Sequence, residues 1–139
     1  MAQQHNHDKN DYAGIVSHLR SIGIKNIVLI GPVPQWQPSL PRSIALRHLS
    51  TKEKTFNDNS FDSTLLNTDK NMKAEFGSGS DVAYISILDH LCKGSDCLAK
   101  VDNNNTPLAW DYGHLSLPGS DFIVKEILSK HLKLSDYLQ

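Results

Sequence analysis

Apolar residues near the start of the chain change from a helical spacing to an unbroken run. Along residues 11–22 they recur at intervals of four and three, which predicts one face of an amphipathic helix. Gly23 follows as a stop signal for that helix. Residues 26–30 then carry a continuous apolar run, typical of a parallel strand covered on both faces. A helix, a glycine turn and a buried strand make half of a βαβ unit.

The same patterns predict the elements that follow. Residues 50–60 show no periodicity and are expected to form a loop. Ser116 is a good N-cap for the last helix, and Pro118 suits its first turn. In chain order, the remaining predicted elements are a short helix, a longer helix that ends at the Gly-Ser run 77–80, a strand and a final helix, over residues 42–49, 61–76, 82–87 and 118–132. Helices that alternate with buried strands predict an α/β fold.

A proline-rich segment, residues 31–41, follows the first predicted strand. Its prolines stand at positions 32, 34, 38 and 41, and proline cannot donate to a strand ladder, so the strand must end here. Loops at the carboxyl ends of strands build the binding crevice of open α/β sheets. We therefore interpret this loop as a wall of the site, with Pro34 and Trp36 as candidate substrate-binding residues. A rigid surface connection is the alternative.

The chain has two cysteines, Cys92 and Cys97. Gly94 lies between them and permits a tight turn, so a small disulfide loop is sterically reasonable. Two cysteines are too few for a closed zinc site, which uses four ligands. We predict the disulfide, which favours an oxidising compartment, while two reduced cysteines near a strand end are the alternative.

Length and charge narrow the choice of function. The 139 residues suit one domain, which we place at residues 11–139 after a polar tail at residues 1–10. The formal net charge of −1 gives no reason to expect nucleic acid or an anionic membrane as a partner. No apolar run reaches the roughly 18 residues that span a bilayer. The first residues also lack the apolar region of a signal peptide.

The candidate chemistry lies in the segment Asp-Tyr-Gly-His at residues 111–114. An aspartate can hold one imidazole nitrogen while the other accepts a proton from a serine hydroxyl, so Asp111 and His114 are candidate catalytic residues. The segment lies just before a capped helix, and a short loop of this kind can fix both side chains. The alternative is a surface carboxylate beside a helix-capping histidine.

Three segments in this order resemble the C-terminal part of an SGNH (GDSL-type) hydrolase-like domain. The resemblance is to the version fused to the membrane domain of acyltransferase-3 family O-acyltransferases, which O-acylate bacterial surface polysaccharides such as lipopolysaccharide. It covers about residues 11–132. The segments are the strand and prolines at 27–34, the strand and cysteine pair at 84–97, and residues 111–119, which are similar to the SGNH block Asp-x-x-His-Leu-Ser-x-x-Gly.

The resemblance implies a three-layer α/β/α fold with a flavodoxin-like parallel sheet. It implies that Asp111 orients His114, and that His114 acts as general base and then general acid for a serine nucleophile that forms an acyl-enzyme. The substrate would be an acyl ester or a surface glycan, and no metal or organic cofactor is needed. It also implies a periplasmic domain of an inner-membrane protein, in contact with the membrane only through the fused acyltransferase domain.

Two family blocks have no counterpart in the chain. Neither the Gly-Asp-Ser block of the nucleophile nor the Gly-x-Asn-Asp block of the oxyanion hole occurs. We therefore expect a partial domain without its N-terminal strands and with negligible esterase activity alone. The alternative is an inactive SGNH-like module that binds glycan or a partner through the Trp36 and Asp111 loops. A sheet without its first strands would also leave an open edge at residues 26–30, where we predict a homodimer.

Overall fold

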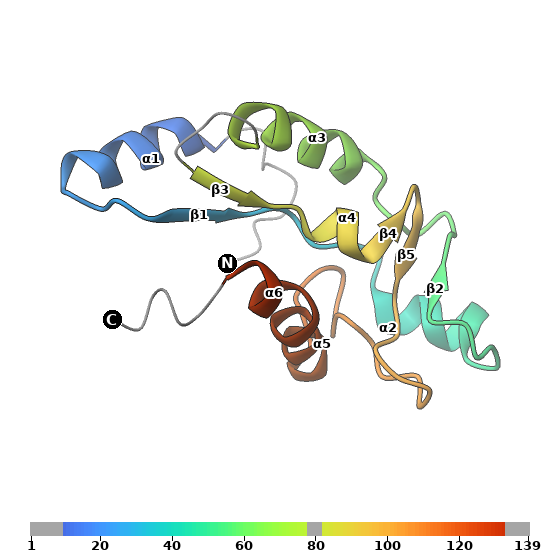
Figure 1. Ribbon diagram of the computed structural model, residues 1–139. Helices are drawn as coiled ribbons and strands as arrows, with labels where there is room; N and C mark the ends of the chain where they lie inside the picture. The colour runs from blue at the N-terminus through green and yellow to red at the C-terminus, as the bar shows by residue number, and fades with distance from the viewer. Residues whose placement is uncertain (1–9, 78–81, 133–139) are drawn as a thin grey trace.

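The computed structural model describes residues 10–77 and 82–132 (Figure 1). The tail predicted before Asn10 and the Gly-Ser run predicted to end the long helix therefore lie largely outside the described residues. The helices and strands, in chain order, are α1 (Tyr12–Ser21), β1 (Ile27–Ile30), α2 (Leu40–Ser43), the π-helical turn η2 (Ile44–His48), β2 (Thr55–Phe56), α3 (Thr64–Phe76), β3 (Val82–Ile85), α4 (Ile87–Leu91), β4 (Cys92–Lys93), β5 (Asp96–Leu98), α5 (Leu117–Ile123), the π-helical turn η3 (Val124–Leu128) and α6 (Ser129–His131).

The predicted helix and strand at the start of the chain are present as α1 and β1. The strand was predicted to be buried on both faces, and this part is wrong: no residue of β1 is buried, and Ile30 is 46% exposed. Asp11 caps α1 by accepting a hydrogen bond from the backbone N–H of Gly14 at 2.7 Å. Gly23 ends the connection with a φ of 93°, a backbone conformation that favours glycine. β1 then pairs with β3 in parallel, with Ile27 opposite Val82 and Ile30 opposite Ile85.

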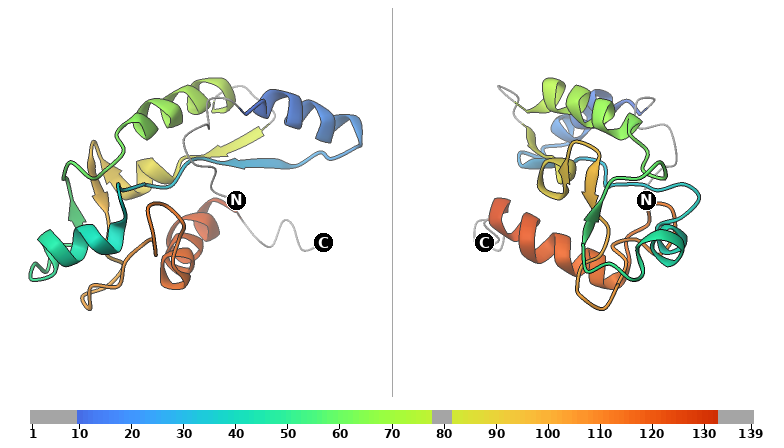
Figure 2. Two further views of the ribbon diagram at one scale, coloured as in Figure 1. Left: turned by 180° about the vertical axis from the view of Figure 1, so that it is seen from behind. Right: turned by 90° about the vertical axis from the view of Figure 1, so that its right-hand side faces the viewer.

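Helices lie on both sides of the parallel pair, which confirms the predicted three layers. In Figure 1, α1 and α3 lie above β1 and β3, while α5 and α6 lie below them, and the turned view of Figure 2 gives the same order. Side chains from the lower helices, Ile123 and Ile127, share one buried cluster with Ile85 of β3. Full burial of such a side chain stabilises the fold by about 1.5–3 kcal/mol.

The long helix α3 covers the sheet with an apolar stripe, as predicted, and with one buried carboxylate. Leu65, Met72 and Phe76 are buried. Asp69 is buried among them, and it accepts hydrogen bonds from the hydroxyls of Tyr84 at 2.7 Å and Ser86 at 2.8 Å. These bonds join the helix to the end of β3 and satisfy a carboxylate that would otherwise be costly to bury.

A second, antiparallel sheet with the order β2-β5-β4 lies where the sequence predicted only a loop and a cysteine turn. β4 and β5 form a hairpin closed by the disulfide between Cys92 and Cys97, and Gly94 in the turn has a φ of 62°. β2 adds to this hairpin through Phe56 opposite Cys97. Two-residue strands such as β2 and β4 carry no readable periodicity, which is why the loop prediction for residues 50–60 was wrong at β2.

One edge of β1 carries no strand in the described part of the chain, because β1 pairs only with β3 there. The homodimer predicted across this edge stays a prediction. Light scattering at high protein concentration tests it, and a strictly monomeric species would contradict it. Across residues 10–77 and 82–132, no helix has both the length and the apolar character needed to cross a membrane.

Candidate active site

The Asp111 loop, residues 110–116, is a closed turn that connects the core to the last helix. Trp110 donates its backbone N–H to the carbonyl of His114 at 3.0 Å, and Ala109 bridges to Leu115. At the end of the loop, Ser116 caps α5 by accepting from the N–H of Gly119 at 3.0 Å. The Ser116 hydroxyl also donates to the carbonyl of Pro107 at 2.7 Å, so the cap fixes both sides of the loop.

Gly119 is required where the last helix starts. A Cβ at this position would lie 2.0 Å from the carbonyl oxygen of Leu108, which is far inside any allowed contact. The close approach brings the start of α5 against residues 107–108, so the sequence Ser-Leu-Pro-Gly at residues 116–119 sets the position of the loop before it.

The carboxylate of Asp111 organises this loop from inside. Its Oδ1 accepts the backbone N–H groups of Gly113 at 3.0 Å and His114 at 2.8 Å, and its Oδ2 lies 2.6 Å from Nδ1 of His114. An ionised carboxylate only accepts hydrogen bonds, so Nδ1 carries the proton. In the neutral imidazole, Nε2 then presents its lone pair, which is the tautomer that a general base needs.

The same contacts keep Asp111 ionised. Burial raises the pKa of its carboxyl, but hydrogen bonds from Gly113 and His114 outweigh this and leave the pKa below its usual value. At neutral pH the group is therefore a full negative charge beside the imidazole, and it stabilises the imidazolium that forms when His114 takes up a proton.

Two aromatic rings flank His114. Trp110 stacks against the imidazole with ring centres 5.7 Å apart, and Tyr112 meets it edge-on at 5.3 Å. Trp110 is 64% exposed and the His114 side chain is 41% exposed, so the imidazole and the indole face solvent together. Sequence reasoning missed Trp110, although its place beside the Asp-x-x-His segment could have indicated it.

The proline-rich segment packs against the Asp111 loop through its backbone. Trp36 donates its N–H to the carbonyl of Tyr112 at 2.7 Å, and Leu40 donates to the carbonyl of Asp111 at 2.9 Å. The contact is close, since a Cβ on Gly113 would lie 2.7 Å from Cγ of Gln35. The structure therefore brings together the two loops that the sequence singled out.

The side chains of Pro34 and Trp36 lie in the core and do not line the site. The exposure of Trp36 is 0%, its ring meets Phe61 edge-on at 6.3 Å, and Pro34 is also fully buried. The prediction that these side chains bind substrate is therefore wrong: the indole adds apolar area to the core, and Trp36 meets the Asp111 loop through its backbone N–H.

No serine accompanies the pair within the described residues. None of the hydroxyls there makes a hydrogen bond with Nε2 of His114. Over the same residues, no group of three His, Cys, Asp or Glu side chains is placed to hold a metal ion. The arrangement is an imidazole that is oriented by a carboxylate through Nδ1.

The mixed α/β fold with its parallel strands is consistent with part of an SGNH domain. The chain belongs to the family described as SGNH domain (fused to AT3 domains), which it matches over residues 2–129. It is similar to the solved periplasmic domain of the lipopolysaccharide acetyltransferase of Salmonella ser. Paratyphi A, with a TM-score of 0.67 and 29% identity. The match covers 85% of this chain and 46% of that structure, so the chain spans about half of its length. No curated protein matches the chain.

Proposed function

We propose that Asp111 and His114 are the proton-handling pair of an acyl-transfer domain that acts on a bacterial surface polysaccharide. The observation that carries the proposal is the 2.6 Å contact between Asp111 Oδ2 and His114 Nδ1, which fixes the orientation of an imidazole whose side chain is 41% exposed. Membership of the SGNH family fused to AT3 domains supports it, as does the similarity to a lipopolysaccharide acetyltransferase periplasmic domain. A proton acceptor held in one orientation is what a weak hydroxyl nucleophile requires.

The proposed reaction has two balanced halves. A serine of the protein, outside the residues described here, gives its proton to Nε2 of His114 as its oxygen attacks the acyl carbonyl. The imidazolium then passes that proton to the departing oxygen, and an acyl-serine forms. In the second half, His114 takes the proton of a sugar hydroxyl, or of water, that attacks the acyl-serine, and it returns the proton to the serine oxygen. Asp111 stabilises the imidazolium in both halves.

We also propose that the domain works outside the cytoplasm, in the periplasm. The disulfide between Cys92 and Cys97 supports this, because disulfides persist mainly in oxidising compartments. The neighbouring solved structure is itself a periplasmic domain. Trapping of free thiols in cells, followed by mass analysis, tests the location: the bond should be intact, and a fully reduced pair would contradict the proposal.

The proposed function is tested in bacterial strains that carry substitutions in the gene for this chain. A strain with His114→Ala is compared with a strain with Lys70→Gln, which changes an exposed side chain of α3 away from the loop. Acetyl esters on the surface polysaccharide are measured as base-labile acetate and by NMR. We expect His114→Ala to reduce the esters to background and Lys70→Gln to leave them unchanged. Normal ester content in His114→Ala, with the protein present at normal level, would overturn the proposal.

A glycan-binding module without catalysis is the second candidate. It is favoured by the exposed indole of Trp110 and by the fact that no described hydroxyl bonds to Nε2 of His114. An aromatic face next to polar groups suits a sugar ring, which has an apolar face and a polar rim. Normal esters in His114→Ala, together with glycan binding that Trp110→Ala abolishes, would select this second candidate.

A further inference from the structure

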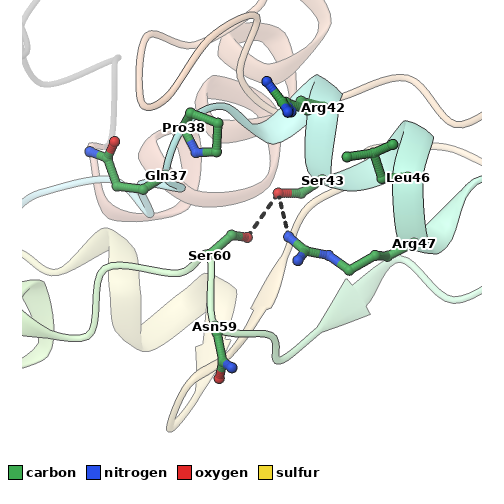
Figure 3. Close-up of a pocket in the computed structure, with 8 residues that line it drawn as sticks. All are labelled: Gln37, Pro38, Arg42, Ser43, Leu46, Arg47, Asn59 and Ser60. Carbon is green, nitrogen blue, oxygen red and sulfur yellow. Dashed lines mark hydrogen bonds between the residues drawn. The ribbon is translucent and has the colours of Figure 1, made fainter.

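A pocket of about 340 Å³ opens between α2, η2 and the loop around Ser60 (Figure 3). This volume lies within the roughly 300–1,000 Å³ of small-ligand sites. Its polar lining combines two guanidinium groups, two hydroxyls and two side-chain amides, from Arg42, Arg47, Ser43, Ser60, Gln37 and Asn59. Donors of hydrogen bonds therefore dominate the walls.

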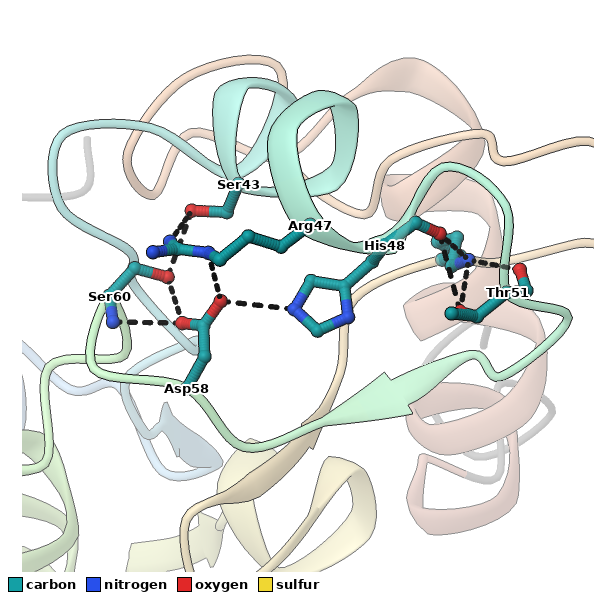
Figure 4. Close-up of polar contacts among 7 residues, drawn as sticks. Ser43, Arg47, His48, Thr51, Asp58 and Ser60 are labelled. Atoms are coloured by element: carbon teal, nitrogen blue, oxygen red, sulfur yellow. Dashed lines mark hydrogen bonds and ion pairs between the residues drawn. The ribbon is translucent and has the colours of Figure 1, made fainter.

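Three residues that line the pocket form a closed ring of hydrogen bonds with Asp58 (Figure 4). Arg47 Nη2 donates to Ser43 Oγ at 3.1 Å, and Ser43 Oγ donates to Ser60 Oγ at 2.9 Å. The Ser60 hydroxyl donates to Asp58 Oδ1, and Asp58 Oδ2 pairs with Arg47 Nε at 3.0 Å, which completes the ring. Because Ser43 and Ser60 are buried, the ring holds the Arg47 guanidinium in one orientation. The remaining N–H groups of that guanidinium are left for a ligand.

The charge of the pocket is positive. Asp58 offsets one guanidinium, that of Arg47. Arg42 is exposed, and over the described residues no carboxylate pairs with it. A fixed guanidinium and an uncompensated one in the lining of the same pocket suit an oxyanion, since arginine binds carboxylates and phosphates in a planar, two-point geometry.

The pocket adjoins the Asp111 loop. The segment 37–40 lies between them: Gln37 donates its N–H to the carbonyl of Ser60 at 2.6 Å, and Leu40 donates to the carbonyl of Asp111 at 2.9 Å. One short stretch of backbone thus separates the pocket from the loop that carries His114.

We propose that this pocket binds the carboxylate or phosphate of an acidic sugar unit, with Arg42 and Arg47 on the oxyanion and Gln37 and Asn59 on the sugar hydroxyls. This assignment rests on the proposed function in one respect, because the sugar is assumed to be part of the glycan substrate. It identifies a specificity site for acidic glycans that is separate from the acyl-transfer pair.

Binding is tested directly on the purified chain, without any activity measurement. Backbone and arginine Nε–H resonances are followed by NMR during titration with D-glucuronate, D-glucose 6-phosphate, D-glucose and inorganic phosphate. We expect one of the two acidic sugars to bind and to shift the Arg42 and Arg47 resonances, and to bind at least about tenfold more tightly than D-glucose. The acidic sugar that binds identifies the oxyanion. Equal affinity for D-glucose, no binding of either acidic sugar, or inorganic phosphate binding as tightly as the sugar would each overturn the proposal.

Two variants locate the binding. Arg42→Gln removes the uncompensated charge from an exposed position and should weaken acidic-sugar binding about tenfold, while the control Lys70→Gln should not change it. Unchanged affinity in Arg42→Gln would contradict the assignment. If Arg42→Gln binds the acidic sugar normally and His114→Ala still abolishes acylation, only the assignment of the pocket is rejected, and the proposed function is unaffected. Conversely, normal acylation in His114→Ala with intact binding would reject only the proposed function.

Discussion

Within the described residues, an aspartate pairs with a histidine in two different regions, and the two pairs differ in what surrounds them. In the Asp111 loop, His114 bonds through Nδ1 at 2.6 Å and its side chain is 41% exposed. In the other region, drawn in Figure 4, His48 bonds to Asp58 through Nε2 at 3.1 Å, and the His48 side chain is 16% exposed. His48 also stacks flat on Phe56 with ring centres 3.6 Å apart, so its ring is a packing surface.

The carboxylates differ as much as the rings. The carboxylate of Asp111 accepts its described hydrogen bonds from within its own loop, from Gly113 and His114. Asp58 accepts bonds from two segments, with Arg47 and His48 on η2 and Ser60 on its own loop. A carboxylate that joins two segments stabilises the fold, whereas one that orients a single exposed imidazole suits the catalytic role that we propose for it. The pair alone therefore does not define a catalytic site.

The largest expected effect is on acyl transfer, which should depend on the Asp111 pair and not on the Asp58 pair. Asp111→Asn should lower the rate of acyl transfer by about 10⁴-fold, because an amide no longer holds the Nδ1–H tautomer of His114. Surface polysaccharide esters should then fall as far as they do in His114→Ala. His48→Phe, which keeps the stack on Phe56, should leave the esters unchanged once protein levels are equalised. Loss of esters in a well-folded His48→Phe protein would contradict this division of roles.

The second prediction concerns stability, which should depend more on Asp58 than on Asp111. Asp58→Ala leaves Arg47, His48 and Ser60 without their acceptor and should lower the free energy of unfolding by about 3 kcal/mol. Asp111→Ala, at a more exposed site, should cost about 1 kcal/mol. Urea unfolding of the purified chain measures both. If Asp111→Ala costs more than Asp58→Ala, the assignment of Asp58 as the structural carboxylate is wrong.

The Asp111 pair could be predicted from the sequence because it is local. Three residues separate the partners, and the helix cap at Ser116 fixes the loop that contains them. The Asp58 pair lies ten positions apart in sequence, and it forms only because β2 and η2 pack together, which no periodic pattern reports. Trp36 misled the prediction for a related reason: an aromatic residue in a proline-rich loop gives no sign of which face of the loop is buried.

The rest of the fold likewise has parts that the sequence predicts and parts that it does not. The helices and the two parallel strands carry enough apolar residues to be read from spacing, and all of them are present. Lys100 shows the opposite case: it is 1% exposed, and its amine donates to the carbonyls of His48 and Thr51 and to the side-chain carbonyl of Asn105. Two of these acceptors, the carbonyls of His48 and Thr51, lie 52 and 49 residues from Lys100 in the sequence, so spacing along the chain cannot reveal them.

A third and smaller effect is expected at the disulfide, which supports the Asp58 region more than the Asp111 loop. Cys97 lies opposite Phe56, and Phe56 carries the stack with His48. Loss of a short closed loop of this kind in Cys92→Ala/Cys97→Ala should cost about 2 kcal/mol. Thermal unfolding measures the cost, and solvent exchange at the backbone N–H groups of η2 should rise more than at those of the Asp111 loop. Equal changes in both regions would contradict this coupling.

The smallest effect is a pH dependence that both carboxylates share. Burial raises the pKa of Asp58, but the hydrogen bonds from Ser60 and His48 and the charge of Arg47 bring it below its usual value. A group whose pKa is lower in the folded state contributes stability that is present above its unfolded pKa of about 3.9 and is lost as pH falls through the folded value.

The unfolding free energy of the unmodified chain should therefore fall below about pH 4. Asp58→Asn removes one contributor, so the stability gap between the two proteins should narrow as the pH falls from about 5 to 3. The difference in unfolding free energy between the unmodified chain and Asp111→Asn should also narrow as the pH falls, because the pKa of Asp111 is also lowered. A gap that stays constant over this range would mean that the Asp58 carboxylate stabilises the fold by its shape and not by its charge. The two pairs would then differ in electrostatics as well as in exposure.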